Sequence, residues 1–217
     1  MVGDLGPTVP GTSAENERRR IYTVSSQNER FWQGEILSGL PQAKLALESL
    51  SATSSTLAPN ETAPVVKIEY DEHPLVVVLS QDCDLEQDYK KRKTGGRPFL
   101  HNILLADVFD AAVLQRKLLA EENSGSRDWR RIEGNHAPRF QFLNSVTTDQ
   151  DALCQGLAAL AVDFRFYFSV RTDELYERLR LGQTKKRCRL QTPYADHLAR
   201  RFHSYQSRIP LVKEHSA

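Results

Sequence analysis

Hydrophobic and polar residues alternate most clearly between Val162 and Val170. Phenylalanine stands at residues 164, 166 and 168, and more polar residues separate the three rings. A period of two is typical of a strand with one buried face. We therefore expect Phe164, Phe166 and Phe168 to be buried together on one face of a sheet.

The run Leu75–Leu79 has no polar alternation, and Pro74 stands at its entrance. Unbroken runs of this kind are typical of strands buried on both faces, so this segment is predicted to be the central strand. The preceding segment, Val66–Tyr70, alternates and predicts a half-buried strand. Because Asp71–His73 separate the two segments, we expect the two strands to pair as a hairpin.

Three helices are predicted where apolar residues recur three or four positions apart behind a capping residue. The first follows Asp107, and the second follows Thr172 and stops at Gly182. The third follows Thr192, with Pro193 at the favoured first position. Further short strands are predicted at Phe31–Leu37, Phe99–Leu105 and Phe140–Phe142.

These elements predict an α+β fold, because the strands are not evenly interleaved with helices as in a doubly wound sheet. We expect a small curved antiparallel sheet or an SH3-like, partly open barrel with about three packed helices. Residues 1–29 contain little apolar material and are predicted to be a disordered N-terminal arm. Residues 30–213 are long enough to form a single domain with its own core.

Composition excludes several classes of protein. The chain has 29 Lys and Arg against 28 Asp and Glu, a net charge of +1, so any affinity for nucleic acid must come from a local patch. The apolar runs are too short for a membrane span, and the N-terminus lacks the order of a signal peptide. Three cysteines without ligand spacing predict neither a disulfide framework nor a zinc site. We expect a cytoplasmic protein with no membrane partner and no cofactor.

An acidic cluster with one thiol follows the central strand and is the first candidate site. Its members are Asp82, Cys83, Asp84, Glu86 and Asp88. The spacing does not fit a calcium-binding EF-hand, since Gln87 and Lys93 stand where glycine and glutamate are required.

Three interpretations of this cluster remain. The carboxylates could hold Mg²⁺ with help from Asp107 or Asp163. Cys83 could be a nucleophile activated by His73 or His101. The favoured interpretation is structural, with Asp82 or Asp84 capping a turn around a small buried cysteine. The catalytic candidates are accordingly Asp82, Cys83, Asp84 and Asp107, and no metal is assigned.

Basic residues form the second candidate site. They lie in three groups: Lys90, Lys91, Arg92 and Lys93; Arg187 and Arg189; Arg200 and Arg201. If the fold brings them together, with Tyr89, Tyr167 and Tyr194 as stacking partners, they would form a phosphate-binding face. If they stay apart, each group is a solvated surface segment.

Three stretches carry a resemblance to a poorly characterised bacterial family. They are Val78–Leu85, with its Ser-Gln-Asp-Cys-Asp-Leu string, Asp163–Phe168, and Arg187–Leu190 with Pro193–Phe202. More distantly, the order of elements resembles the PemK/MazF toxins, whose fold is a small SH3-like barrel. Gly34–Leu37, Pro74–Ser80 and Asn102–Asp107 correspond to three toxin strands.

The toxin resemblance implies the barrel more than the activity. The toxins cleave RNA with an Arg after the opening strand and a Ser or Thr after the third. Here Ser38–Leu40 and Asp107–Phe109 stand at those places. We therefore expect a bacterial binding domain without a complete catalytic set, with a protein or a single-stranded nucleic acid as partner. The alternative is a nucleic-acid-binding protein or an endoribonuclease related to these toxin–antitoxin systems, using the acidic cluster.

Overall fold

The computed structural model describes residues 20–46, 67–121 and 125–208, which form a seven-stranded antiparallel sheet and five α-helices. The strands are β1 (Tyr22–Val24), β2 (Glu35–Leu45), β3 (Ile68–Val78), β4 (Asn102–Asp110), β5 (Phe140–Leu143), β6 (Leu160–Arg171) and β7 (Lys185–Leu190). The helices are α3 (Asp82–Lys93), α4 (Ala111–Glu121), α5 (Ser126–Glu133), α6 (Thr172–Arg180) and α7 (Tyr194–Gln206). The strand order is β1-β7-β2-β3-β4-β6-β5, and the sheet does not close on itself. The predicted α+β class and curved antiparallel sheet are thus confirmed.

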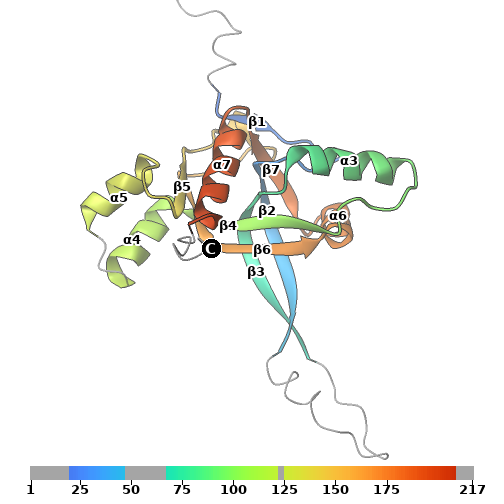
Figure 1. Ribbon diagram of the computed structural model, residues 1–217, viewed down its shortest axis with the longest axis horizontal. Helices are drawn as coiled ribbons and strands as arrows, with labels where there is room; N and C mark the ends of the chain where they lie inside the picture. The colour runs from blue at the N-terminus through green and yellow to red at the C-terminus, as the bar shows by residue number, and fades with distance from the viewer. Residues whose placement is uncertain (1–19, 47–66, 122–124, 209–217) are drawn as a thin grey trace, which may run out of the picture.

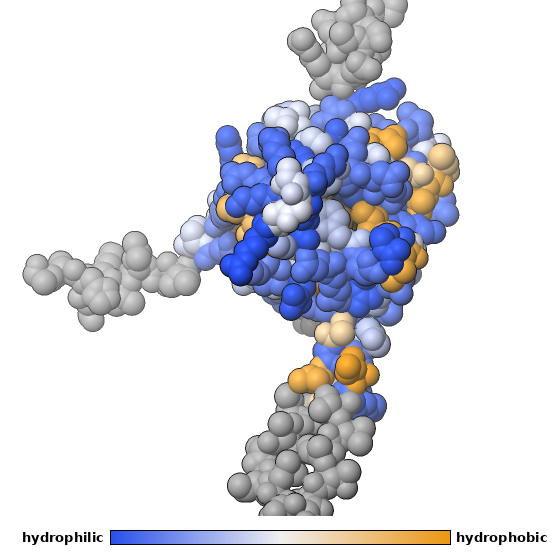
Figure 2. Space-filling model, turned by 90° about the vertical axis from the view of Figure 1, so that its right-hand side faces the viewer, coloured by the Kyte–Doolittle hydropathy of each residue, from blue (hydrophilic) through white to orange (hydrophobic). Residues whose placement is uncertain are grey.

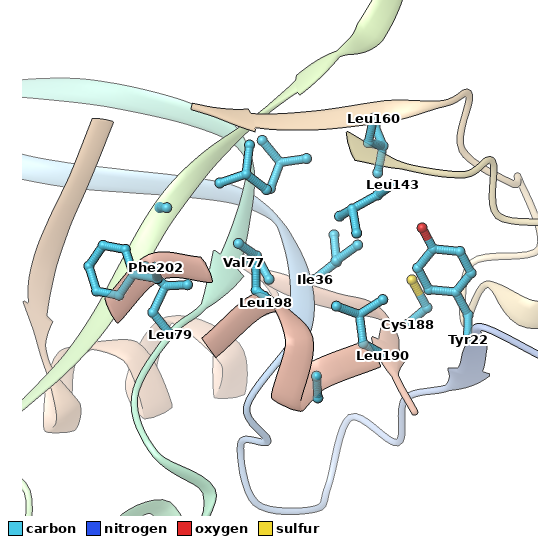
Figure 3. Close-up of a cluster of buried hydrophobic side chains, with 14 of the residues drawn as sticks. Tyr22, Ile36, Val77, Leu79, Leu143, Leu160, Cys188, Leu190, Leu198 and Phe202 are labelled. Atoms are coloured by element: carbon cyan, nitrogen blue, oxygen red, sulfur yellow. The ribbon is translucent and has the colours of Figure 1, made fainter. Parts of the chain in front are cut away.

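The central strand is buried on both faces, as its unbroken apolar run predicts. On one face, Val77 packs with residues of α7, among them Leu198 and Phe202 (Figure 3). On the other face, Val76 and Val78 pack with Leu85 of α3 and Leu175 of α6. Helix α7 and the pair α3 and α6 therefore cover opposite faces of the sheet. Helices α4 and α5 form a smaller cluster beside β5 (Figure 1).

The predicted hairpin between Val66–Tyr70 and Leu75–Leu79 is wrong. Both segments, from Ile68 onwards, belong to the single strand β3, which pairs along its length with β2. Among the described residues, neighbouring strands form backbone pairing with these two strands only near their base, where β7 pairs with Glu35–Ser38 and β4 with Val76–Val78. The rest forms a two-stranded arm that projects from the sheet (Figure 1). Its apolar residues Leu45, Ile68 and Tyr70 are exposed. Figure 2 shows hydrophobic side chains on the surface of the projecting part of the molecule.

The expectation for the three phenylalanines is half wrong. Phe164 is fully buried and Phe168 partly buried, but Phe166 is 42% exposed. The cause is an irregularity in the pairing of β4 with β6. Ala106 and Val108 of β4 are two residues apart, but their partners on β6, Tyr167 and Val162, are five residues apart. β6 therefore has three extra residues at this point. Because three is an odd number, side chains with the same alternation lie on opposite faces of the sheet before and after this point.

Three sequence predictions of element bounds need correction. The helix expected after Asp107 begins only at Ala111, because residues 107–110 belong to β4, and Asp110 accepts the first backbone N–H groups of α4. The residues of the acidic cluster begin a helix, α3, and α5 is a further helix that the apolar pattern did not predict. Within the predicted arm at residues 1–29, residues 20–29 contain β1, which pairs with β7 and buries Tyr22. Residues 1–19 lie outside the described part of the chain.

Among the helices that the structure describes, none is long and apolar enough to cross a membrane.

Candidate functional site

A polar pocket of about 450 Å³ lies where β1, β7 and the beginnings of α3 and α7 meet. We call it the Arg189 pocket. Its lining residues are Thr23, Trp32, Gln33, Asp82, Arg189, Leu190, Gln191, Thr192, Ala195 and Asp196. The volume is within the range of small-ligand sites, roughly 300–1,000 Å³. Seven of the ten residues have hydroxyl, amide or charged side chains, so the pocket suits a polar ligand.

One wall of the pocket is built by a bidentate ion pair. The guanidinium of Arg30 donates to both carboxylate oxygens of Asp82 at 2.9 and 2.8 Å, and also to the Asp82 carbonyl oxygen. The backbone N–H of Gln33 approaches the same carboxylate at 3.4 Å. The pair therefore ties the segment before β2 to the first residue of α3, and it uses much of the hydrogen-bonding capacity of Asp82.

Two guanidinium groups lie over the ring of Trp32. The Cζ atom of Arg30 is 3.4 Å from the ring centroid, and that of Arg189 is 4.0 Å from it. Arg30 is neutralised by Asp82, whereas Arg189 makes no ion pair or hydrogen bond among the described residues. The contact with the ring holds the Arg189 guanidinium in place, while none of its N–H donors bonds to a described residue. The pocket thus contains a positioned cation that lacks an acidic partner in the described chain.

A buried ion pair supports the segment that carries Trp32. Lys186 and Glu35 are both fully buried, and their side chains are 3.3 Å apart. Lys186 Nζ also donates to the carbonyl oxygens of Glu29 and Arg30, at 2.9 and 2.7 Å. Glu35 accepts the backbone N–H of Trp32 at 3.3 Å. Burial raises the pKa of Glu35 and lowers that of Lys186, each opposed by the partner's charge. Through these hydrogen bonds to backbone groups, Lys186 and Glu35 fix the position of the segment that contains Arg30 and Trp32.

Gly34 is required at the corner between Trp32 and β2. Its φ is +77°, a conformation that other residues adopt only with strain. A Cβ atom there would lie 3.0 Å from the Cβ of Leu190, which leaves no room for it. The backbone of Gly34 bonds to Val78 and to Leu190. This close approach of three chain segments places Trp32 beside Arg189.

The acidic cluster does not form a shared site. Asp82 pairs with Arg30, while the Cys83 thiol is near only Gln81 and Asp84. Asp88 is buried and accepts hydrogen bonds from Arg92 and from the backbone of Phe99 and Leu100. In the described residues, no three His, Cys, Asp or Glu side chains are grouped so that they could hold a metal ion. The contacts of Asp82 and Asp88 are structural, but the predicted arrangement is wrong: neither Asp82 nor Asp84 caps α3, and Cys83 is exposed rather than buried.

Asp107, the fourth catalytic candidate, contacts His73 rather than Cys83. Its carboxylate is 2.6 Å from Nδ1 of His73, whose ring stacks on Phe168 at 4.1 Å. The other ring nitrogen, Nε2, faces the side-chain oxygen of Gln42 at 3.3 Å. Both ring nitrogens therefore face oxygen acceptors, and no hydroxyl or thiol of the described residues bonds to the ring. The arrangement ties β2, β3 and β4 together without a nucleophile.

The predicted basic residues have separate roles. Arg187 forms a buried pair with Asp151, and Arg201 donates to the carbonyl oxygens of Asn135, Ala137 and Phe140. Arg92 bonds to Asp88 and Asp173. Lys90 pairs with Glu86, while Lys91 and Lys93 lie over the rings of Phe99 and Tyr89. Arg200 is exposed on α7, and the C-terminal end of α3 lies well away from α7 (Figure 1). Of the eight residues, only Arg189 lines the pocket.

Sequence reasoning missed Trp32, Gln33 and Gln191 as site residues. Trp32 is one of only two tryptophans and stands two residues before a glycine, which was a usable local signal. Gln33 and Gln191 had no such signal, because they come from segments that are about 160 residues apart in the chain and meet only in the folded protein.

Comparison of the chain with protein-family models, with curated proteins and with solved structures found no match in any of the three. The resemblances to a bacterial family and to the PemK/MazF toxins therefore stay predictions.

Proposed function

We propose that this protein is a binding domain that holds one nucleotide, either free or within a single-stranded nucleic acid, in the Arg189 pocket. The proposal is carried by one observation: Arg189 is a positioned guanidinium with no acidic partner among the described residues, in a polar pocket of ligand size. A guanidinium presents a planar set of donors that matches a phosphate group.

The surroundings of Arg189 support a nucleotide over a simple anion. The pocket offers side-chain amides in Gln33 and Gln191 and hydroxyls in Thr23 and Thr192, while the faces of the Trp32 ring are already covered by Arg30 and Arg189. Side-chain amides and the planes of arginine guanidiniums are among the groups that single-stranded bases contact in proteins. Helices α3 and α7 also point their N-terminal ends, which carry partial positive charge, towards the pocket. Asp82 and Asp196 offset part of that field, so the binding of a bare phosphate should be weak.

The endoribonuclease alternative has less support from the described contacts. Of its acidic candidates, Asp82 is engaged in an ion pair and Asp107 by His73, while Asp84 contacts only the Cys83 thiol among the described residues. A nuclease needs a base or a metal beside the scissile phosphate. We therefore propose binding without chemistry of its own, by a bacterial cytoplasmic protein as the resemblance implies.

The test is calorimetric titration of the purified protein with a nucleoside monophosphate and with a five-nucleotide RNA. Binding of both would place recognition in one nucleotide; binding of the RNA alone would require further contacts along the strand. Affinity for the RNA should fall with salt, with a log–log slope of about −0.7 for each phosphate contacted.

The variant Arg189→Gln should weaken binding of the RNA about tenfold or more. It should also make the log–log salt dependence less steep by about 0.7, the share of one phosphate contact. Arg200→Gln is the matched control, because it removes an exposed arginine of α7 outside the pocket and should leave binding unchanged. If neither ligand binds at about 50 mM salt, the proposal fails, and a protein partner becomes the better hypothesis.

A further inference from the structure

The two amide side chains of the Arg189 pocket have their orientations set by the backbone around them. Gln33 Nε2 donates to the carbonyl oxygen of Leu79 at 3.1 Å, and Gln191 Nε2 donates to that of Tyr22 at 3.5 Å. A carbonyl oxygen can only accept, so a flipped amide would place oxygen against oxygen. In both residues the nitrogen is therefore held by the protein, and Oε1 is the end left for a ligand.

Both amides are tied to rigid parts of the sheet. The backbone N–H of Leu79 bonds to Leu104 at the end of the central strand, and that of Gln191 bonds to Ile21 beside β1. Among the described residues neither Oε1 accepts a hydrogen bond, and neither is a buried atom without a partner. Because both residues line the pocket, these oxygens are accessible acceptors at fixed places on its wall.

The hydrogen-bonding character of the pocket is thus divided. Arg189 supplies the cationic donor, while Gln33, Gln191 and the carboxylate of Asp196 supply acceptors. A matching ligand has an anionic group for Arg189 and N–H donors for the acceptors. Among nucleotides, adenine and cytosine present an exocyclic amine, where uracil presents a carbonyl oxygen.

We infer, on the basis of the proposed nucleotide site, that Gln33 and Gln191 make the pocket select bases that carry an exocyclic amine and reject uracil. On its pairing edge uracil has one donor, N3–H, between two carbonyl oxygens, so it could satisfy only one of the two Oε1 atoms and would set an oxygen against the other. Sites built to pair with a donor discriminate strongly against an analogue that lacks it.

Cytidine and uridine 5′-monophosphates provide the test, because their rings have the same size and differ on one edge, where cytosine has an amine beside the N3 acceptor and uracil has a carbonyl oxygen beside an N3–H donor. Calorimetric titration of the wild-type protein should give an affinity for the cytidine nucleotide about ten- to a hundredfold higher. The double variant Gln33→Met/Gln191→Met keeps the side-chain length and removes the amides. It should reduce this ratio to near one, mainly by weakening the cytidine nucleotide.

Gln87→Met on the exposed face of α3 is the control and should keep the wild-type ratio. The circular dichroism spectrum and melting temperature of each variant show whether it is folded; if the double variant is not, the single variants Gln33→Met and Gln191→Met should each lower the ratio. Equal wild-type affinities for the two nucleotides would overturn the inference and leave the proposed function standing. Absence of binding by either nucleotide would overturn the inference, and the proposed function would fall with it only if the five-nucleotide RNA did not bind either.

Discussion

Phe164 and Phe166 have the same sequence pattern and opposite environments. Phe164 is fully buried, and its ring lies 5.5 and 5.8 Å from those of Phe202 and Tyr205 of α7. Phe166 is 42% exposed and makes an edge contact with Phe109. At the scale of the residue, burial is therefore decided by pairing with the next strand, and the phenylalanines should differ greatly in their contribution to stability.

Phe164→Ala should lower the free energy of unfolding by about 3–5 kcal/mol, because it leaves a cavity between the sheet and α7. Phe166→Ala should lower it by less than about 1 kcal/mol, because the ring is already partly solvated. Urea denaturation of both variants checks the contrast. Similar losses of unfolding free energy for the two variants would contradict the assignment of Phe164 and Phe166 to different environments.

The pair of Asp151 with Arg187 predicts a dependence on pH. Burial opposes the charge of Asp151, but hydrogen bonds from Arg187 and from the backbone N–H groups of Leu153 and Gln155 outweigh it and lower its pKa. A carboxyl group with a lowered folded-state pKa stabilises the protein above its unfolded pKa of about 3.9, and this stabilisation is lost as pH falls. The loss of stability in Asp151→Asn should therefore be large at pH 7 and shrink below about pH 4.

Urea denaturation of the wild-type protein and of Asp151→Asn at a series of pH values measures the difference in their free energies of unfolding. Glu72→Gln, at an exposed position of β3, is the control and should show a small difference at every pH. A constant loss for Asp151→Asn across the series would contradict the ionic role of the pair.

At the scale of the element, α3 shows how a charged segment can be structural. Asp88 is buried on a helix that otherwise buries only Leu85, and it bonds to Arg92 and to the two backbone N–H groups of Phe99 and Leu100. The carboxylate therefore joins the end of α3 to the start of β4, as a cap does for a helix.

Asp88→Ala should destabilise the protein by about 3–5 kcal/mol, because it leaves the backbone N–H groups of Phe99 and Leu100 and the half-buried Arg92 without this buried acceptor. Glu86→Ala, which removes an exposed ion pair with Lys90 on the same helix, should stay close to wild type. Thermal melts of the two variants check the difference. An Asp88→Ala variant as stable as Glu86→Ala would show that the connection contributes little.

The arm formed by β2 and β3 is the second informative element. From Gly39 to Leu45 and from Ile68 to Leu75, each strand pairs only with the other. A two-stranded ribbon is only marginally stable in water. Native-state hydrogen exchange should therefore show paired amides of the arm exchanging much faster than those of Ile36 and Val77 at its base. Equal protection would mean that something covers the arm in solution.

At the scale of the whole molecule, the described part of the chain arranges many of its charges as local ion pairs. Buried or half-buried arginines pair with Asp82, Asp88, Asp151 and Asp163. These four carboxylates lie at separate places in the fold and are already paired with arginines. We therefore expect divalent cations to have no effect on the stability of the molecule.

Millimolar Mg²⁺ or Ca²⁺ should leave the melting temperature unchanged. A cation at a hundredfold excess over its dissociation constant would stabilise the fold by about 2.7 kcal/mol, which a thermal shift detects easily. An increase that disappears in Asp82→Asn would show that Asp82 holds a metal and would revive the nuclease hypothesis.

Local pattern was sufficient for part of this protein. The unbroken run at Leu75–Leu79 determined a strand buried on both faces, and the residues after Thr172 and Thr192 determined helices α6 and α7 within two residues. These features depend on side-chain periodicity and on the conformation of proline, which act over a few residues. The α+β class followed from the order of such segments.

Tertiary structure alone decided the rest. The face change in β6 depends on how β4 pairs with it, and α3 is a helix although its sequence has no apolar stripe. The Arg189 pocket joins Trp32, Asp82 and Gln191, which are far apart in the chain. Whether Arg187 or Arg189 is available to a ligand was also undetermined by the sequence, since both are arginines on one strand. Arg187 has a buried carboxylate opposite it and Arg189 has the ring of Trp32, and only folding brings those groups into contact.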